Sequence, residues 1–281
     1  MIKLAVFGDP ISHSLSPTIH AEFAKQAGLA VDYTRIQASA TEFAARFADF
    51  EQAGGVGANI TLPLKELAAK RADKLAAAAL HSGAVNTLIK QNNSWLGENT
   101  DGIGLVTDIE RHHVSLAGAK VLIVGAGGAA RGVIPALLTA KVATIHVANR
   151  SPERAEALIQ HMGQQHTLDQ ATQLTAGSLS LIPATAYTII INATSSGLRG
   201  EQLSLPNQIT NQKPFCYDMV YGEKPTPFML WAISNDCSVA DGLGMLVGQA
   251  AASFQLWTGV RPDVLPILSL LRKRLGLWNS L

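Results

Sequence analysis

Three observations predict an α/β protein built from two domains. Strand-like and helix-like segments alternate along the whole chain, and such alternation is typical of parallel sheets covered by helices. One strand passes into a helix through a glycine-rich loop, in the stretch KVLIVGAGGAAR at residues 120–131. The chain has 281 residues, a length that suits one large domain or two ordinary ones.

The first half of the chain alternates short apolar segments with helical ones. Ser16 and Pro17 are expected to be an N-cap and the first helical residue, and Gly28 is expected to end that helix. Residues 63–80 are rich in alanine and predict one long helix. The other predicted elements are strands at residues 2–7, 31–36 and 57–60, a helix at 41–53, and a hairpin of 85–89 with 94–97.

The second half continues the alternation after residue 104 and ends in helix. Asp241 is a plausible N-cap for a long amphipathic helix. The apolar seam of that helix consists of Leu243, Val247, Ala250, Phe254 and Trp257. The remaining predicted elements are strands at residues 121–124, 144–148, 189–191 and 215–219, and a helix at 129–138.

Domain boundaries are predicted near residues 101–104 and near Gly242. Residues 102–241 then form a Rossmann-type domain, because this middle segment alone has the length of a complete nucleotide-binding unit. Residues 1–101 together with 242–281 form the other domain, an α/β substrate domain. The C-terminal helices are therefore expected to pack back on the first domain.

The composition argues against several classes of partner. The formal net charge is +1, so bulk electrostatics favours neither nucleic acid nor an anionic membrane. A hydrophobic fraction of 47% and a charged fraction of 15% indicate a globular protein with a substantial core. The eight histidines show neither an HExxH pattern nor a zinc-finger spacing with cysteines, so no metal site is expected.

Cysteine usage and the first residues predict a cytoplasmic protein. Cys216 and Cys237 are far apart in the sequence and form no CxxC pair, which suits a reduced protein without disulfides. The first residues, MIKLAVFGDP, are not expected to be a signal peptide, because their apolar run is only a strand long. No apolar stretch approaches the ~18 residues that suggest a membrane span.

The glycine-rich loop predicts a dinucleotide site. Gly125 and Gly127 directly follow a strand, and Ala130 lies in the helix that the loop opens. The first glycine allows a tight turn, the second lets a pyrophosphate approach the backbone, and the small alanine permits close helix–strand packing. The N-terminus of the helix supplies amide donors and a favourable dipole for the phosphates.

The next strand favours NADP over NAD. An NAD site usually ends this strand with an acidic residue that binds the ribose 2′-hydroxyl. Here the strand ends in Asn149 and Arg150, and Arg154 follows one turn later. Two guanidinium groups without a carboxylate suit a 2′-phosphate, whereas solvated surface arginines would be the commoner case elsewhere in a chain.

The first half holds a set of neutral polar residues at the ends of predicted segments, where α/β proteins normally hold ligands. These residues are Ser14, Ser16, Asn59, Thr61, Asn86, Thr87, Asn99 and Thr100. Each also has a structural interpretation, since a serine can cap a helix and an asparagine can stabilise a turn. Gln249, on the C-terminal helix, needs a partner if buried, and either a ligand or a backbone carbonyl could supply one.

Lys65 and Asp101 are the charged residues near this set that could form a catalytic pair. Lys65 lies at the start of a predicted helix, where the helix dipole disfavours a cation, so its position suggests a function. Hydride transfer to a ketone leaves an alkoxide, and a lysine can protonate it while a carboxylate holds the lysine. The sequence leaves open which member of the pair carries the transferred proton.

The chain resembles the shikimate dehydrogenase family over almost its full length. The motifs that carry the resemblance are GDPISHSLSP, NITLPLKE, GAVNTL, GENTDGIG, VGAGGAARG, ANRSPERA, INATSSGL, YDMVYGEKPTPF and DGLGMLVGQAAASFQLWTG. The resemblance implies NADPH-dependent, reversible reduction of 3-dehydroshikimate to shikimate, in the route to chorismate and the aromatic amino acids. Thr188 stands where the family often has an acidic residue, and residues 163–186 match no motif of the family.

The resemblance also implies residue roles. Lys65 and Asp101 are implied to be catalytic and to contact the substrate, and Ser14 and Ser16 to bind its carboxylate. Asn59, Thr61, Asn86, Tyr221 and Gln249 are implied to contact the ring hydroxyls or the catalytic pair. The residues implied to hold NADP are Gly125, Ala126, Gly127, Gly128, Ala129, Asn149, Arg150, Ser151 and Arg154 at the phosphates, and Thr194, Ser195, Met219 and Gly242 at the ribose and nicotinamide.

Two other functions compete with this interpretation. A quinate/shikimate dehydrogenase that uses both NAD and NADP is compatible with Ser14 and Ser16, although Arg150 and Arg154 argue against equal use of NAD. A non-catalytic NADP-sensing regulator is disfavoured because it would need neither Lys65 nor Asp101. The expected partner is a small-molecule substrate, and the sequence leaves monomer and homodimer open.

Overall fold

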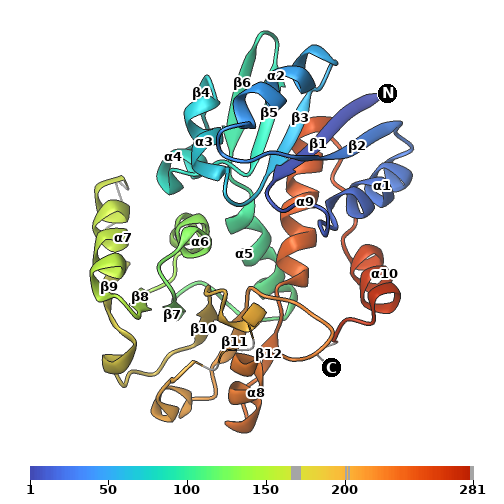
Figure 1. Cartoon of the computed structure of the whole chain (residues 1–281). Helices are drawn as coiled ribbons and strands as arrows, with labels where there is room; N and C mark the ends of the chain where they lie inside the picture. Colours follow the sequence, from blue (N-terminus) through green and yellow to red (C-terminus); the bar gives the residue numbers. More distant parts are fainter. Residues whose placement is uncertain (166–171, 200, 202, 279–281) are drawn as a thin grey trace. The chain divides into compact units, whose positions relative to one another are not determined.

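The structure is a computed structural model that describes residues 1–165, 172–199, 201 and 203–278. The chain divides into two compact units. The first contains residues 1–104 and 247–267, and the second contains residues 105–246 and 268–281. Both units are α/β, as predicted, and their elements can be followed by colour in Figure 1.

The first unit is built on a mixed six-stranded sheet in the order β2-β1-β3-β5-β6-β4. Strands β2, β1 and β3 run parallel, β5 is antiparallel to both β3 and β6, and β4 is parallel to β6. The strand bounds are Ile2–Gly8 (β1), Val31–Gln37 (β2), Gly57–Ile60 (β3), Lys74–Leu75 (β4), Thr87–Gln91 (β5) and Ser94–Glu98 (β6). The helix bounds are Ser16–Ala27 (α1), Phe43–Gln52 (α2), Lys65–Arg71 (α3) and Ala77–Ser82 (α4).

An aromatic cluster forms the core between this sheet and α2. Phe7 on β1 contacts the rings of Phe43, Phe47 and Phe50 at centroid distances of 5.6–5.8 Å. Phe47 also contacts Trp95 on β6, with ring centroids 4.8 Å apart in an edge-to-face arrangement. Such offset aromatic contacts add to the stabilisation that burial alone provides.

Two predictions about helices in this unit were wrong. Ser16 is the first residue of α1 rather than its cap, and no side chain caps this helix. The predicted helix at 63–80 is broken, because residues between α3 and α4 pair with β6. Asp73 and Trp95 exchange hydrogen bonds, with the Asp73 backbone N–H donating to the Trp95 carbonyl at 2.9 Å. Pairing with a strand has overridden the helix propensity of an alanine-rich segment.

The second unit is built on a fully parallel six-stranded sheet in the order β12-β11-β10-β7-β8-β9. This is the strand order of a Rossmann fold, and its order reverses between β7 and β10. The strand bounds are Lys120–Val124 (β7), Thr144–Asn149 (β8), Gln173–Ser178 (β9), Ile189–Asn192 (β10), Phe215–Asp218 (β11) and Val239–Ala240 (β12). The helix bounds within it are Gly128–Thr139 (α6), Pro152–Gln165 (α7) and Pro227–Ser234 (α8).

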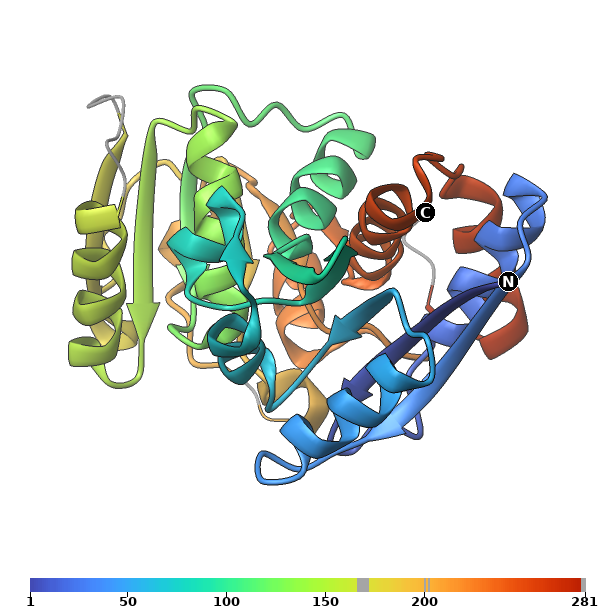
Figure 2. The same cartoon turned by 90° about the horizontal axis from the view of Figure 1, so that it is seen from above.

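Helices cover this parallel sheet, as βαβ connections require. Helix α7 packs on β8 and β9, and both views show it beside those strands at the yellow-green end of the sheet (Figures 1 and 2). The buried strands are almost continuously apolar. Ile189, Ile190 and Ile191 on β10 are each 0% exposed.

The C-terminal part of the chain differs from the predicted domain division. Helices α5 (Asp101–Arg111), α9 (Leu243–Thr258) and α10 (Leu265–Leu275) each contain a boundary between the units. Most of α9 belongs to the first unit, as expected for a C-terminal helix. Residues 268–281, however, group with the second unit. The reason is local bonding, since Arg272 pairs with Asp241 and the Trp278 backbone N–H donates to the Gly222 carbonyl.

Candidate active site

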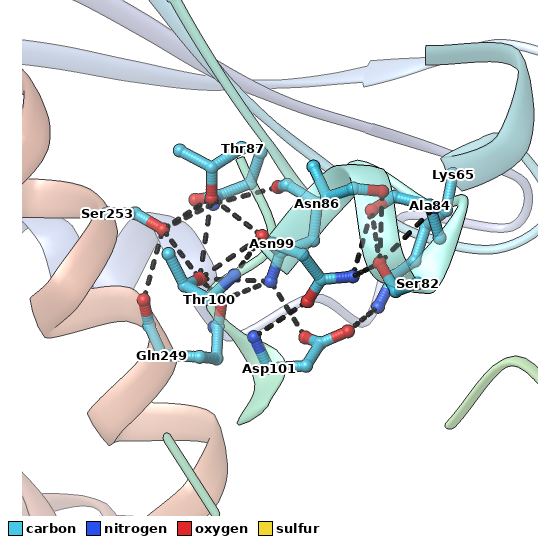
Figure 3. Close-up of polar contacts among 12 residues, drawn as sticks. Lys65, Ser82, Ala84, Asn86, Thr87, Asn99, Thr100, Asp101, Gln249 and Ser253 are labelled. Carbon is cyan, nitrogen blue, oxygen red and sulfur yellow. Dashed lines mark hydrogen bonds and ion pairs between the residues drawn. The ribbon is translucent and has the colours of Figure 1, made fainter. Parts of the chain in front are cut away.

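Lys65 and Asp101 form an ion pair in the first unit. Lys65 is the first residue of α3, which follows the carboxyl end of β3, and Asp101 is the first residue of α5. The Lys65 ammonium donates to Asp101 Oδ2, and the two side chains are 23% and 11% exposed. Figure 3 shows the two side chains pointing toward one another. The pair that the sequence predicted is therefore formed in the structure, close to solvent but not fully exposed.

A hydrogen-bond network fixes the Asp101 carboxylate in position (Figure 3). Asn86 Nδ2 donates to Asp101 Oδ1 at 2.7 Å, so each carboxylate oxygen has a partner. Asn86 is itself held by Thr100, whose backbone N–H donates to Asn86 Oδ1 at 2.8 Å. The Asp101 backbone N–H donates to Asn99 Oδ1 at 3.0 Å. A carboxylate held in this way can orient a lysine without moving itself.

Helix α9 contributes Gln249 and Ser253 to the same network. Gln249 is 9% exposed, and its Oε1 accepts from Asn86 Nδ2 at 3.4 Å. Ser253, one turn later, lies 2.7 Å from Thr87 Oγ1 and 3.0 Å from Asn59 Nδ2. Ser253 was not predicted. The available signal was its spacing of four residues from Gln249, which places both on one face of a mostly apolar helix.

Asn59 connects this network to a buried aromatic group. Its Oδ1 accepts from the Tyr33 hydroxyl at 2.7 Å and from His20 Nε2 at 3.2 Å. Its Nδ2 faces the Asn86 carbonyl, Thr87 Oγ1 and Ser253 Oγ, so both amide hydrogens have protein acceptors. Asn59 thus joins strands β3 and β5 to helix α9. The resemblance placed Asn59 in contact with the ring hydroxyls or the catalytic pair, and that role stays a prediction.

His20 and Tyr33 were missed by sequence reasoning. Their rings stack at 4.3 Å with an angle of 9° between planes. Burial lowers the pKa of His20 to about 3, and the hydrogen bond that His20 donates to Asn59 acts in the opposite direction. Burial also raises the pKa of the Tyr33 hydroxyl, although the Ser16 hydroxyl, bonded to it, acts in the opposite direction. Nothing in the spacing of these residues distinguishes them from ordinary core aromatics, so no pattern could have marked them.

The remaining predicted residues of the first unit lie near the ends of β1 and β3. Ser16 is 6% exposed, and its hydroxyl acts to lower the pKa of Tyr33. Ser14 is half-buried; its Oγ accepts from the Ser16 backbone N–H at 3.3 Å, and its carbonyl accepts from Arg35 at 2.6 Å. Thr61 is half-buried directly after β3, and its backbone N–H donates to the Phe7 carbonyl.

The glycine loop of the second unit has the geometry of a phosphate cradle. Gly125 has a φ of +108°, and a Cβ there would lie 2.9 Å from Thr194 Cγ2, so the turn itself requires glycine. Gly127 and Gly128 are different. A Cβ at either would meet no heavy atom within 4 Å among the residues that the structure describes. The space above them is open at the start of α6, where backbone N–H groups can receive a phosphate.

The predicted adenosine-phosphate residues lie at the end of β8. Asn149 ends the strand, and its Nδ2 donates to the Ser151 carbonyl at 2.9 Å. Arg150, Ser151 and Arg154 are exposed. The Arg154 backbone N–H donates to the Ser151 carbonyl, which places Arg154 in the first turn of α7. Both guanidinium groups are accessible to an anion beside the strand end.

The predicted ribose and nicotinamide residues follow β10, β11 and β12. Thr194 Oγ1 donates to Asn192 Oδ1 at 2.7 Å, and the Met219 backbone N–H donates to the Asn192 carbonyl. The two strand ends are thereby tied together. The other predicted cofactor residues here and in the glycine loop are exposed Ser195 and Ala129, half-buried Ala126, and buried Gly242. Tyr221 also belongs to this second unit, where burial raises the pKa of its hydroxyl.

In the part of the chain that the structure describes, no group of three or more His, Cys, Asp or Glu side chains could hold a metal ion. Within the same residues no helix is long and apolar enough to cross a bilayer.

A Rossmann sheet with an open phosphate cradle, in one chain with an α/β unit that carries a lysine–carboxylate pair, defines a dinucleotide-dependent oxidoreductase. Three family models match the chain: the shikimate dehydrogenase substrate-binding domain at residues 6–88, shikimate/quinate 5-dehydrogenase at 108–200, and the shikimate 5′-dehydrogenase C-terminal domain at 242–272. The chain belongs to the shikimate dehydrogenase family.

Individual relatives agree with this assignment. A protein of Xanthomonas oryzae pv. oryzae named shikimate dehydrogenase (NADP(+)) is 47% identical over 276 residues, which cover 97% of this chain and 96% of that protein. The Thermus thermophilus shikimate 5-dehydrogenase, solved with NADP(H) and shikimate, has a TM-score of 0.83 at 32% identity over 97% of this chain and 99% of its own. The Listeria monocytogenes enzyme, solved with shikimate and NAD, has a TM-score of 0.88 at 28% identity over 96% of each chain.

Proposed function

We propose that this chain catalyses the reversible, NADP-dependent interconversion of shikimate and 3-dehydroshikimate. The single observation that carries the proposal is the Lys65–Asp101 pair, which lies in the unit whose sequence matches the shikimate dehydrogenase substrate-binding domain. The open cradle at Gly127 and Gly128 supports use of a dinucleotide. Relatives named as NADP-dependent shikimate dehydrogenases support the choice of substrate and cofactor.

In this proposal the pair handles the proton of the reaction. Bound NADPH supplies the hydride that reduces the ketone carbon. The carbonyl oxygen becomes an alkoxide, and Lys65 donates a proton to it from Nζ. Asp101 holds the Lys65 ammonium and keeps it directed, because Asn86 fixes its other carboxylate oxygen. In the oxidation direction the same groups take the proton back.

Neutral polar groups would bind and orient the ring. Asn86 bonds to Asp101 and to Gln249, so both amides lie close to the pair, and we propose that they contact the ring hydroxyls. Ser14 and Ser16 would receive the carboxylate, as the resemblance implies. The resemblance assigns the remaining substrate contacts to Thr61 and Tyr221.

Cofactor choice rests on the exposed guanidinium groups at the end of β8. We predict that Arg150→Ala raises the KM for NADPH about tenfold or more and changes the KM for NADH much less, because only NADPH carries the 2′-phosphate. Steady-state rates with each cofactor measure the effect. Lys120→Ala is the matched control, since Lys120 is an exposed cation at the opposite, amino-terminal edge of the same sheet. Equal effects of Arg150→Ala on both cofactors would refute this assignment.

The proposed setting is the cytoplasm, which the two buried, free cysteines Cys216 and Cys237 support. The proposed partner is the small-molecule substrate, with no nucleic acid and no membrane, for a monomer or a homodimer. Quinate turnover with NAD is the second candidate activity, favoured by the family model that covers both substrates.

One assay tests the proposed function against its rivals. Formation of the reduced cofactor, NADPH or NADH, is followed by absorbance with shikimate and NADP, and then with quinate and with NAD in turn. The proposal expects turnover with shikimate and NADP that far exceeds turnover with the other pairs. Comparable quinate turnover would favour the dual-specificity enzyme, and no turnover with any pair would favour the NADP-sensing regulator.

A further inference from the structure

A forked ion pair joins the last helix to the loop after β12. Arg272 on α10 donates to Asp241 through both terminal nitrogens, at 2.7 and 2.6 Å. The Arg272 side chain is 16% exposed and the Asp241 side chain 2%. A bidentate pair of this kind fixes orientation as well as distance, and a lysine cannot reproduce it. The proposed reaction uses neither residue.

Asp241 lies beside a closely packed segment of backbone. Its Oδ1 accepts from the Leu243 backbone N–H at 3.2 Å, which holds the start of α9. Between them, the Gly242 backbone N–H donates to the Val220 carbonyl at 3.1 Å. A Cβ at Gly242 would lie 2.1 Å from the Met219 carbonyl oxygen. The segment after β12 therefore lies directly on the segment after β11.

Arg272 also holds the segment after β11 through the C-terminal tail. Its guanidinium donates to the carbonyl of Trp278, as well as to Asp241. The Trp278 backbone N–H in turn donates to the Gly222 carbonyl at 2.9 Å. One side chain thus ties the segments that follow both β11 and β12.

Sheet topology indicates which part of a dinucleotide would lie near the segments that follow β11 and β12. A Rossmann sheet consists of two mononucleotide-binding halves, and the ligand lies outside the carboxyl ends of the strands across the point where the strand order reverses. Here the glycine loop and the 2′-phosphate residues belong to the half made of β7, β8 and β9. Strands β10, β11 and β12 form the other half, so the segments held by Arg272 face the nicotinamide nucleotide.

We infer that Arg272 is a positioning residue for the nicotinamide half of the cofactor, acting through Asp241, Gly242 and Trp278 without touching the cofactor. This inference rests on the proposed NADP-dependent function. It also gives helix α10 a role in the cofactor-binding unit. This role agrees with the grouping of residues 268–281 with the second unit. A misplacement of about 1 Å at a reacting group can cost on the order of 10²-fold in rate. Arg272 can therefore affect turnover although it does not touch the cofactor.

The test compares two ligands on one variant. Arg272→Lys keeps the positive charge but loses the fork, and Arg272→Gln removes the charge. Dissociation constants are measured by titration calorimetry for NADPH and for adenosine 2′,5′-bisphosphate, which lacks the nicotinamide half. Arg274→Gln is the matched control, because Arg274 is an exposed arginine on the same helix. Binding is expressed per folded molecule, determined by near-UV circular dichroism, so that partial unfolding of Arg272→Gln does not imitate weak binding.

We expect Arg272→Lys to weaken NADPH binding about tenfold while the bisphosphate still binds within about twofold of wild type. Turnover should fall as well, and Arg274→Gln should change none of these values. Unchanged NADPH affinity and turnover in Arg272→Lys, or equal weakening of both ligands, would overturn the inference while leaving the proposed function intact. Failure of the wild-type chain to bind NADPH at all would overturn the proposed function, and the inference with it.

Discussion

Replacing Lys65 with alanine is expected to lower kcat for shikimate oxidation by about 10²-fold or more, which is the usual contribution of a positioned proton donor or acceptor. The Lys65 ammonium is the group that pairs with the fixed Asp101 carboxylate. Without the lysine, the shikimate hydroxyl must give its proton to water instead. Binding of NADP should persist, because the phosphate cradle lies in the other unit. Steady-state kinetics with saturating NADP and direct cofactor titration measure the two effects separately.

Lys70→Ala is the matched control for this experiment. Lys70 lies on the same short helix and is exposed, so its removal should leave turnover within about twofold of wild type. Asp101→Asn provides an independent check, because the amide cannot hold the lysine as a charged partner. If Lys65→Ala retained near-normal turnover, Lys65 would not be the proton donor, and the catalytic pair would have to be reassigned.

The second large effect is a pH dependence of stability that His20 causes. The pKa of His20 is lowered from 6.5 to about 3 by burial in the folded chain. Its Nε2 faces Asn59 Oδ1, and its Nδ1 has no hydrogen-bond partner among the described residues, so a second ring proton would have no acceptor. Below pH 6.5, His20 binds a proton in the unfolded chain but stays neutral in the folded chain. The free energy of unfolding therefore falls as the pH decreases from 6.5 toward 3.

The expected size of this effect is about 2 kcal/mol between about pH 7.5 and about pH 5, from about 1.4 kcal/mol per pH unit below about 6.5. Urea unfolding of wild type and His20→Gln at both pH values measures it. The variant is less stable at the higher pH, because it loses the stacking on Tyr33, but it should lose about 2 kcal/mol less on acidification. His113→Gln, at an exposed histidine, should behave like wild type. An identical pH dependence in His20→Gln would contradict a buried, neutral His20.

The features that the sequence predicted best are determined by residues that lie close together in the chain. Gly125 and Gly127 sit between a strand and a helix, and only a few backbone geometries can connect such elements. The hairpin of β5 and β6 was found because a polar turn separates two apolar runs. The end of β8 was predicted from the apolar strand that precedes Asn149 and Arg150. In these cases the local sequence contains most of the information that determines the structure.

Other features depend on residues far apart in the chain and could not be predicted. The alanine-rich segment 63–80 favours helix, but pairing of Lys74 and Leu75 with β6 interrupts it. The position of α10 depends on Arg272 reaching Asp241, 31 residues earlier. Ser253 enters the site only because α9 passes beside Asn59 and Thr87. Such contacts are set by tertiary packing, which single-sequence patterns do not record.

The central claim is that this chain transfers a hydride between NADPH and the ketone of 3-dehydroshikimate. The most direct test uses NADPH deuterated at C4 of the nicotinamide, in two preparations that carry the label on opposite faces of the ring. The purified chain is incubated with 3-dehydroshikimate and each preparation, and the product is analysed by mass spectrometry and NMR. We expect shikimate with one deuterium, on the carbon that carried the ketone, from one of the two preparations. Absence of product, or product without deuterium from both preparations, would contradict the claim.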